Sequence, residues 1–384
     1  MRTSSMIIFL LIALSIYSLI NFYIFRRGWQ ALSGMGTLRY IFLAIFLFLV
    51  LSYPAARFAE RLHRSRLTEI FIFIGAFYLA LMVHLLLLVL FVDIVRLGNK
   101  FLHYFPSRIT EHAQKAGQIA FFAVGVTALM IVVGGIVNAL YLRVRTLDLA
   151  VDKSAGEVRA LNIVLVSDIH LGTIVRSSRL EKIVERINEL KPDLVLMPGD
   201  IADEDISPPE AKKMAAVLQK LQARYGVFSA TGNHEYYGGL ERNLAYLRQG
   251  KVMVLMDEAV KVGNSFYVIG RKDLTARQFG ERRKPLAKIL ESVDSQLPLI
   301  LLDHQPVHLE EAEQNGIDLQ LSGHTHNGQL FPLNLINKFF YEDNWGYLRK
   351  GKTQYYVSCG VGTWGPSMRT ASVPEIVQIK LRFR

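Results

Sequence analysis

The sequence predicts a membrane-anchored α/β protein, in which four transmembrane helices precede a domain of two mixed β-sheets flanked by helices. Two observations support this fold class. The 384-residue chain is 51% hydrophobic, and its long apolar runs with few charges all begin before residue 120. From about residue 161, short apolar runs alternate with amphipathic stretches, which is typical of strands interleaved with helices.

Four apolar runs are each long enough to cross a bilayer as a helix, which takes about 20 residues. They cover residues 6–25, 38–56, 70–95 and 117–142. The first run is too long for the core of a signal peptide and lacks a cleavage site after it, so we expect it to be retained. The predicted organisation is a transmembrane region at 1–145, a linker at 146–160 and a second domain at 161–384.

An even number of crossings places the N-terminus and the second domain on the same side of the membrane. Arginine and lysine residues slightly favour that side as the cytoplasmic one. We therefore expect a multi-pass protein of the inner cell membrane with a cytoplasmic second domain. His84 and Asp93, in or at the end of the third run, either mark a separate membrane function or simply hydrogen-bond a neighbouring helix.

Composition restricts the partners and the kind of metal site. The formal net charge is +11, but much of it lies beside the apolar runs, where basic residues are expected. The polar loops described below lack the interleaved basic and aromatic residues of an oligonucleotide groove, so nucleic acid is not an expected partner. Cys359 is the only cysteine, which excludes an intrachain disulfide and a cysteine-based metal site.

The second domain begins with a predicted parallel sheet. Amphipathic helices are expected at 180–190 and 210–224, where apolar residues recur at helical spacing. Residues 252–273 and 354–383 alternate with period two and are predicted to form a second sheet packed on the first. The predicted strands of the first sheet are residues 161–166, 194–197, 226–230, 299–302 and 319–321.

A polar loop follows each of these five strands. Ligands of open α/β sheets bind beyond the carboxyl ends of the strands, so these loops are expected to converge. Their carboxylate, imidazole and amide groups suit divalent cations, and five such loops are much stronger evidence than one. The candidates are Asp168 and His170 in SDIHLG, Asp200 and Asp203 in GDIAD, Asn233 and His234 in GNHE, His304 in DHQP, and His324 and His326 in GHTH.

This ordered set of motifs resembles the calcineurin-like metallophosphoesterase superfamily from about residue 161 to the C-terminus. Residues 360–376 are similar to a bacterial branch that includes membrane-associated phosphodiesterases of the YaeI and YkuE type and, more distantly, enzymes that hydrolyse UDP-2,3-diacylglucosamine. The resemblance implies a hydrolase with two divalent metal ions. Manganese is the expected metal, with iron, zinc and magnesium as alternatives.

The resemblance also implies a role for each candidate residue. One metal would be held by Asp168, His170 and His326, the other by Asn233, His304 and His324, with Asp200 bridging them. A metal-activated hydroxide would attack phosphorus in a phosphodiester or pyrophosphate. His234 would be catalytic, as a proton donor to the leaving alkoxide or a partner of the phosphoryl oxygens, with Asp203 orienting it. The alternative for Asp203 is an ordinary turn carboxylate.

The substrate is less constrained by the sequence. Residues 330–350 are rich in Phe, Leu, Tyr and Trp and would suit a bilayer or an acylated substrate if exposed, or core packing if buried. Asn327 stands where the family that this sequence resembles usually has a glycine after the HxH motif, and Asp303 precedes the lone histidine, His304. We expect both residues to affect the shape of the rim of the site.

The predicted function is a membrane-bound phosphoesterase with a phosphorylated small-molecule or lipid substrate, such as UDP-2,3-diacylglucosamine, and with membrane lipids as partners. Two alternatives remain at this stage. One is a phosphodiesterase for soluble substrates that is merely tethered to the membrane. The other is a non-enzymatic membrane sensor or partner-binding protein that retains the metal site. The sequence leaves the oligomeric state open.

Overall fold

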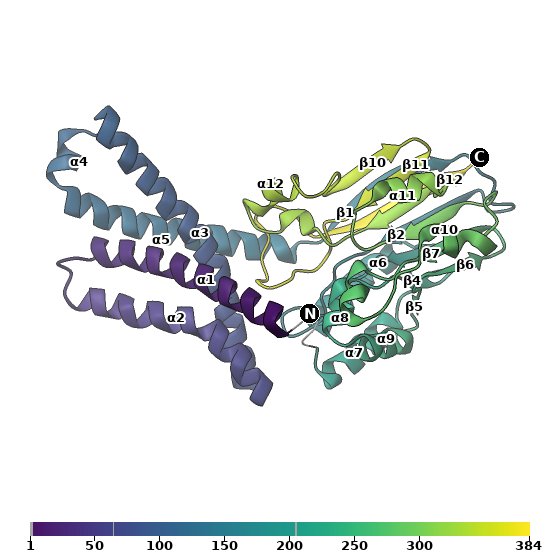
Figure 1. Ribbon diagram of the computed structural model, residues 1–384, viewed down its shortest axis with the longest axis horizontal. Helices are drawn as coiled ribbons and strands as arrows, with labels where there is room; N and C mark the ends of the chain where they lie inside the picture. The colour runs from purple at the N-terminus through teal and green to yellow at the C-terminus, as the bar shows by residue number, and fades with distance from the viewer. Residues whose placement is uncertain (1–2, 64, 204–205) are drawn as a thin grey trace. The chain divides into compact units, whose positions relative to one another are not determined.

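The structure, a computed structural model, describes residues 3–63, 65–203 and 206–384 (Figure 1). The chain divides into two compact units, Met1–Ile136 and Val137–Arg384. The first unit is built from helices and the second from two sheets with helices, as the sequence predicts.

The first unit contains the apolar helices. Three helical stretches of the described chain, Thr37–Glu60, Arg66–Leu102 and Ala113–Leu140, are long and apolar enough to cross a membrane. They coincide with the second, third and fourth predicted spans. The first predicted span, residues 6–25, falls within the first helix of the chain. Several side chains at the start of this helix lie outside the described residues, so the prediction that the helix crosses the membrane stays a prediction. The helices are α1 (Thr3–Ala31), α2 (Thr37–Leu62), α3 (Arg66–Leu102), α4 (Ser107–Glu111) and α5 (Ala113–Leu140).

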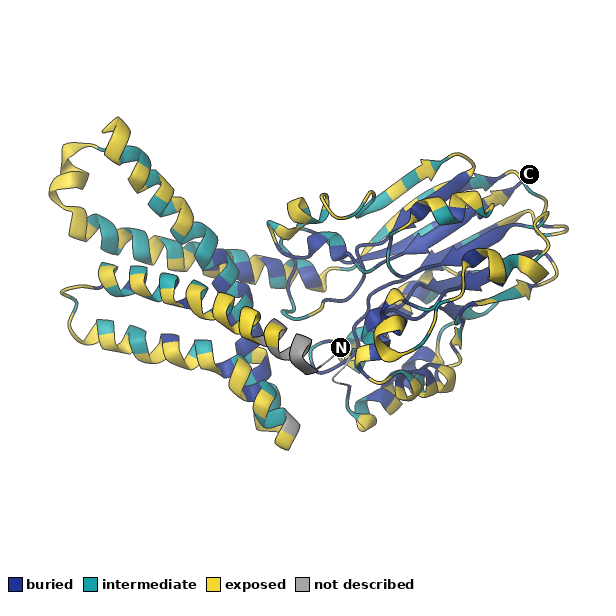
Figure 2. Cartoon of the chain, viewed as in Figure 1, coloured by how far each residue is buried: buried dark blue, intermediate teal, exposed yellow. Residues whose placement is uncertain are grey.

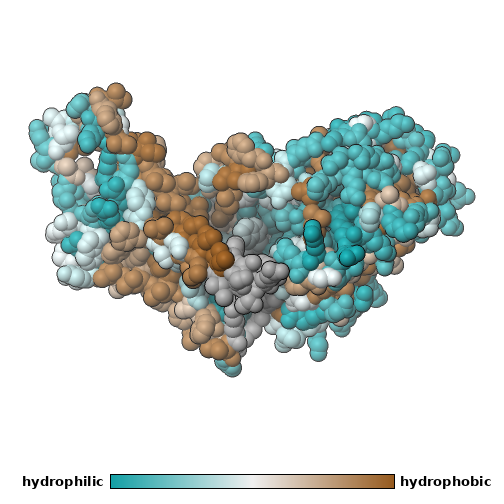
Figure 3. Space-filling view, in the orientation of Figure 1, coloured by the Kyte–Doolittle hydropathy of each residue, from teal (hydrophilic) through white to brown (hydrophobic). Residues whose placement is uncertain are grey.

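Hydrophobic side chains cover much of the surface of this unit (Figure 3). Its interior is a small cluster in which Ile24, Phe46, Tyr78 and Met82 pack together. Helices that turn apolar side chains outward are stable in lipid, where their backbone groups are satisfied within the helix. His84 is buried, and its Nδ1 hydrogen-bonds the carbonyl oxygen of Ala80 at 2.8 Å, one turn earlier on the same helix.

The second unit holds two six-stranded mixed sheets. The first sheet has the order β1-β12-β2-β3-β4-β5, with strands β1 (Arg143–Val151), β12 (Glu375–Phe383), β2 (Ala160–Leu165), β3 (Leu194–Met197), β4 (Val227–Ser229) and β5 (Met253–Val254). The second has the order β10-β11-β9-β8-β7-β6, with β10 (Gly346–Lys350), β11 (Thr353–Val357), β9 (Leu319–Ser322), β8 (Leu299–Leu302), β7 (Phe266–Gly270) and β6 (Glu258–Val262).

The main core lies between the sheets, where Ile163 and Leu196 of the first pack with Ile300 and Leu321 of the second. These strands are buried on both faces (Figure 2), because further helices cover the outer faces. Helices α6, α7 and α9 pack on the first sheet, and α10 and α11 on the second. The helical segments are α6 (Ser177–Glu189), α7 (Pro208–Leu218), α8 (Asn233–Tyr237), α9 (Leu240–Gln249), α10 (Leu286–Ile289), α11 (Leu309–Gln314), α12 (Leu333–Asn337), and the 3₁₀ turns η1 (Leu274–Phe279), η2 (Leu290–Ser292) and η3 (His326–Gly328).

Two predictions about the sheets were wrong. Strands β8 and β9 belong to the second sheet, not the first, and β12 lies in the first sheet between β1 and β2. The physical reason is that every strand here is a short apolar run, and local periodicity cannot report which partner a strand pairs with. The candidate loops therefore come from two sheets.

The predicted linker at 146–160 was also wrong in its first part. Residues 146–151 belong to β1, which pairs in parallel with β12 along its whole length. The unit begins earlier still, in the last turn of α5, where Asn138 Nδ2 donates hydrogen bonds of 2.9 Å to the carbonyl oxygens of Arg369 and Ser372. Alternating charged and apolar residues in this segment suit an edge strand whose outer face meets solvent.

Candidate metal centre

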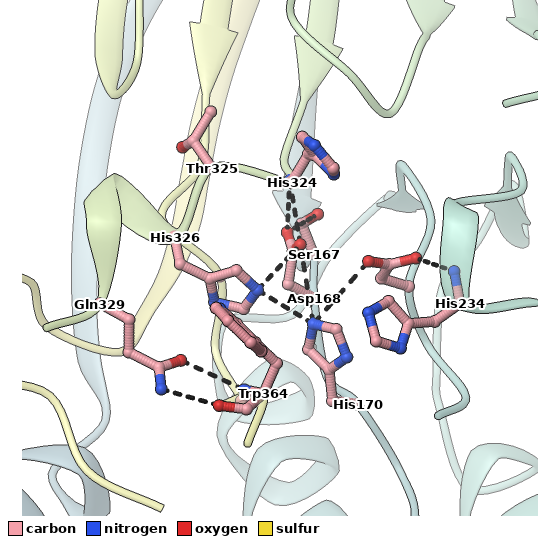
Figure 4. A network of polar contacts seen from close by, with 12 residues as sticks. Ser167, Asp168, His170, His234, His324, Thr325, His326, Gln329 and Trp364 are labelled. Carbon is pink, nitrogen blue, oxygen red and sulfur yellow. Dashed lines mark hydrogen bonds and ion pairs between the residues drawn. The ribbon is translucent and has the colours of Figure 1, made fainter. Parts of the chain in front are cut away.

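The nine predicted site residues lie close together. Figure 4 labels Asp168, His170, His234, His324 and His326 among them. Three groups of side chains have potential ligand atoms within 4.8 Å of one another. The ninth residue, Asn233, places Oδ1 2.9 Å from Nδ1 of His324. The groups are Asp168, His170 and His326; His170, Asp203 and His234; and Asp200, His304 and His324.

The first group consists of three buried side chains whose potential ligand atoms face one another. His170 Nε2 lies 2.9 Å from His326 Nε2 and 4.0 Å from Asp168 Oδ1, and His326 Nε2 lies 3.3 Å from the same oxygen. Burial lowers the pKa of His170 to about 4 and that of His326 well below its usual value. Both rings are therefore neutral and have lone pairs available for a metal, with a carboxylate to balance its charge.

The group of Asp200, His304 and His324 is oriented by the backbone. His304 Nδ1 lies 2.7 Å from the carbonyl oxygen of Pro198, to which it donates, so that Nε2 faces Asp200 Oδ2 at 3.1 Å. Burial opposes charge on His304, but the Asp200 carboxylate raises its pKa above the usual value. Among the described residues, His304 Nε2 has no hydrogen-bond partner of good geometry. A cation bound at Nε2 would take the place of the proton.

Asp200 lies between the two groups. Its Oδ2 is 3.8 Å from His170 Nε2 and 3.1 Å from His304 Nε2, while its Oδ1 accepts a hydrogen bond from the backbone N–H of His234 at 2.9 Å. One carboxylate thus faces both sets of nitrogen donors. The donor set suits two divalent cations, and Asp200 would be available to both.

His234 lies at the wall of a cavity of about 300 Å³, which is also lined by His170, Asp200, Asn233, His324 and His326. Its Nδ1 is 2.7 Å from Asp203 Oδ1. Burial alone would lower the pKa of His234, but the hydrogen bond to Asp203 and the charges of Asp200 and Asp203 outweigh it and raise the pKa to about 9. The Asp203 carboxylate therefore orients an imidazolium that can act as an acid.

Several of these residues have a left-handed backbone, which is uncommon outside glycine. The angle φ is 53° at Asp168 and His170, 52° at Asp200, 71° at His324 and 49° at His326. Such conformations persist where surrounding contacts hold them, and they cluster at functional sites. Figure 4 shows the rings of His170 and His326, from two of these backbone positions, pointing toward each other.

Glu235 is a supporting residue that the sequence interpretation missed, although it belongs to the GNHE motif. It is fully buried, and its carboxylate accepts hydrogen bonds of 2.7–3.0 Å from four backbone N–H groups. It thereby clamps the Asp200 loop to the start of α8. Its position three residues after Gly232 is that of a capping box, which could have identified it. The donors are Asp200, Ile201, Ala202 and Gly232.

Arg369 is a second missed residue, in the closing stretch of the sequence. Its side chain is fully buried, and Nη2 donates to the carbonyl oxygens of Gly362 at 2.6 Å and Gly360 at 3.2 Å. The same nitrogen lies 3.2 Å from Nδ1 of His326. Arg369 therefore holds the loop after β11 against the back of a candidate ligand.

Asp303 and Asn327, the two residues that depart from the usual family pattern, lie in different environments. Asp303 is buried and pairs with Arg271 and Arg283, so the prediction that it shapes the rim was wrong. Nothing in the local sequence marks these two arginines as its partners. Asn327 accepts a hydrogen bond of 2.9 Å from the side chain of Asn344, which ties the histidine loop to the segment after α12.

Gly323 permits the close approach of β9 to the first ligand loop. A methyl group at this position would overlap Ser167 Oγ and Asp168 Oδ2. We expect Gly323→Ala to lower the free energy of unfolding by about 1–3 kcal/mol and to reduce metal content, measured by thermal unfolding and elemental analysis. Gly134→Ala, which meets nothing within 4 Å, is the control. Unchanged stability and metal content in Gly323→Ala would contradict this packing.

The chain is similar in sequence to known proteins. A family model described as calcineurin-like phosphoesterase matches residues 161–328. "Uncharacterized metallophosphoesterase Cj0846" of Campylobacter jejuni is 31% identical over 379 residues, 98% of each chain. An "Uncharacterized metallophosphoesterase" of Helicobacter pylori strain J99 is 37% identical over 225 residues, 58% of this chain and 60% of its own. A "Transmembrane protein with metallophosphoesterase domain" of Danio rerio is 35% identical over 294 residues, 72% of this chain and 66% of its own.

Proposed function

Since the chain belongs to the calcineurin-like metallophosphoesterase family, we propose that this phosphoesterase hydrolyses a phosphodiester or pyrophosphate bond in a lipid or nucleotide-lipid, such as UDP-2,3-diacylglucosamine. Two divalent cations, manganese by expectation, would polarise the phosphoryl group and lower the pKa of a bound water. We place the protein in the inner cell membrane with its catalytic unit in the cytoplasm. The single observation that carries the lipid assignment is the apolar surface beside the cavity.

Each of the nine site residues would have a distinct role in hydrolysis. Asp168, His170 and His326 would hold one cation, Asn233, His304 and His324 the other, and Asp200 both. His234 would give its proton to the departing oxygen, and Asp203 would keep its ring turned toward the substrate. Burial of the ligands excludes bulk water and strengthens these interactions.

The apolar surface consists of exposed side chains on α12, its flanks and the loop after β11. We refer to it as the apolar rim. Phe339 and Phe340 are 88% and 74% exposed, and Leu333 and Trp364 also line the cavity. Exposed apolar side chains close in sequence to residues that line a polar cavity suit acyl chains next to a phosphate. The apolar rim comprises Phe331, Leu333, Leu335, Ile336, Phe339, Phe340 and Trp364.

The alternatives are supported less well. A tethered enzyme for soluble substrates would gain nothing from exposing Phe339 and Phe340 beside its cavity. A non-enzymatic sensor would not require His234 and Asp203 to be paired at the cavity wall. The apolar rim and this pair therefore favour an enzyme that acts on an amphiphile.

Full-length protein in detergent tests the proposal. We expect Mn²⁺-dependent hydrolysis of both bis-p-nitrophenyl phosphate and UDP-2,3-diacylglucosamine. The double variant Phe339→Glu/Phe340→Glu should lower kcat/KM for the lipid about tenfold or more, because burying a phenylalanine side chain contributes about 1.5–3 kcal/mol. The soluble diester should be cleaved at the normal rate.

Met253→Glu, an exposed apolar residue on edge strand β5, serves as the control and should leave both activities unchanged. Equal rates of lipid hydrolysis in the double variant and the wild type would favour the tethered enzyme for soluble substrates. Absence of turnover on either substrate, with both metals bound, would favour the sensor.

A further inference from the structure

A charged cluster lies among the apolar helices of the first unit. Asp93 of α3 is 17% exposed, and its carboxylate is 2.7 Å from Nε of Arg27 on α1 and 3.8 Å from Nη1 of Arg96. The hydroxyl of Tyr23 also donates to Asp93. One carboxylate thus faces two guanidinium groups, so the cluster carries one net positive charge.

A cavity of about 280 Å³ adjoins this cluster, between α1, α2, α3 and α5. Beyond Arg27, Asp93 and Arg96, its described lining is made of apolar side chains and glycines, with Phe46 and Val124 among them. Exposed residues such as Leu129 also line it, so it opens to the outside of the bundle. An apolar space of this kind is costly to leave empty.

A second cavity of about 810 Å³ continues the first. The two share Arg27 and Arg96 in their walls. The second one adds the amide side chains of Gln30, Asn99 and Gln114. Together they form a continuous space whose apolar end is the first cavity. Two arginines lie at the junction, and the second cavity has three amide side chains in a lining that is otherwise mostly apolar.

We propose that this space binds an anionic phospholipid, with an acyl chain in the apolar cavity, its phosphate at Arg27 and Arg96, and its headgroup among the amides. Guanidinium groups bind phosphate with two parallel hydrogen bonds, and one net positive charge favours an anionic lipid. The apolar end favours a lipid over free phosphate. The site lies in the first unit, contains no residue of the metal centre and is independent of the proposed function.

Delipidated full-length protein provides the test, with binding measured by native mass spectrometry and by thermal unfolding. Dioleoyl phosphatidylglycerol should bind more tightly than dioleoyl phosphatidylcholine and raise the Tm, and glycerol 3-phosphate should do neither. Arg96→Gln should weaken phosphatidylglycerol binding about tenfold, the order expected for one charge-assisted hydrogen bond. Arg26→Gln, the same change at an exposed neighbouring position, should bind like the wild type.

A second pair of variants tests the apolar end. Ala120→Phe fills the cavity and should reduce binding of phosphatidylglycerol, whereas Ala123→Phe adds the same ring at an exposed position outside the lining. Equal binding of both lipids by the wild type and both arginine variants would overturn the proposal. Tight binding of glycerol 3-phosphate alone would also overturn it, by identifying a free-phosphate site.

Discussion

Replacement of Asp200 by asparagine is expected to lower kcat/KM about a thousandfold, the scale on which a preorganised charge-stabilising group acts, and to reduce the bound metal. Oδ2 of Asp200 lies within 3.8 Å of His170 Nε2 and 3.1 Å of His304 Nε2. A neutral amide in its place would remove the negative charge that is proposed to hold two cations near each other. Asparagine keeps an oxygen that can accept the N–H of His234, so we expect the fold to survive.

Elemental analysis, thermal unfolding and hydrolysis with and without added Mn²⁺ would check this expectation. Asp148→Asn provides the control, because this carboxylate is exposed on edge strand β1. Normal turnover by Asp200→Asn with two metals per chain would refute the bridging role. A full biological effect of a catalytically dead Asp200→Asn would instead favour a sensor.

Replacement of His234 by asparagine should lower kcat by about 10²–10⁴-fold for a substrate with an alkoxide leaving group, the range typical of a lost general acid. Metal content should stay normal, because His234 belongs to neither proposed ligand set. p-Nitrophenolate leaves without a proton, so hydrolysis of bis-p-nitrophenyl phosphate should fall far less. An equal loss on both substrates would show that His234 stabilises the phosphoryl oxygens instead.

Two further variants separate the chemistry of His234 from effects on folding. Asp203→Asn should give a smaller loss of about 10–100-fold, as expected for a residue that only orients another. His308→Asn, at a histidine whose side chain is 71% exposed, should have normal activity. Loss of metal in His234→Asn would contradict the assigned role and place this ring among the ligands.

Much of the site could be predicted because its chemistry is local in the chain. Each short apolar run ends in a loop with its own carboxylate, imidazole or amide, and the structure brings all nine side chains together. The roles assigned to them remain predictions. Glu235 and Arg369 could not be identified by ligand type, because they contact backbone groups whose positions depend on the folded loops.

The sequence by itself determined which residue types end each strand, the three apolar helices of the described chain and the α/β character of the second unit. The tertiary structure decided that β8 and β9 pair in the second sheet, that β1 extends the first, and that five site residues have left-handed backbones. The physical reason is the distance along the sequence between the residues that interact. Residue periodicity reports on neighbours a few positions apart, whereas β12 pairs with β2 across more than 200 residues. Contacts between distant parts of the chain also hold the loops with left-handed backbones, as the hydrogen bond from the His324 N–H to Asp168 shows.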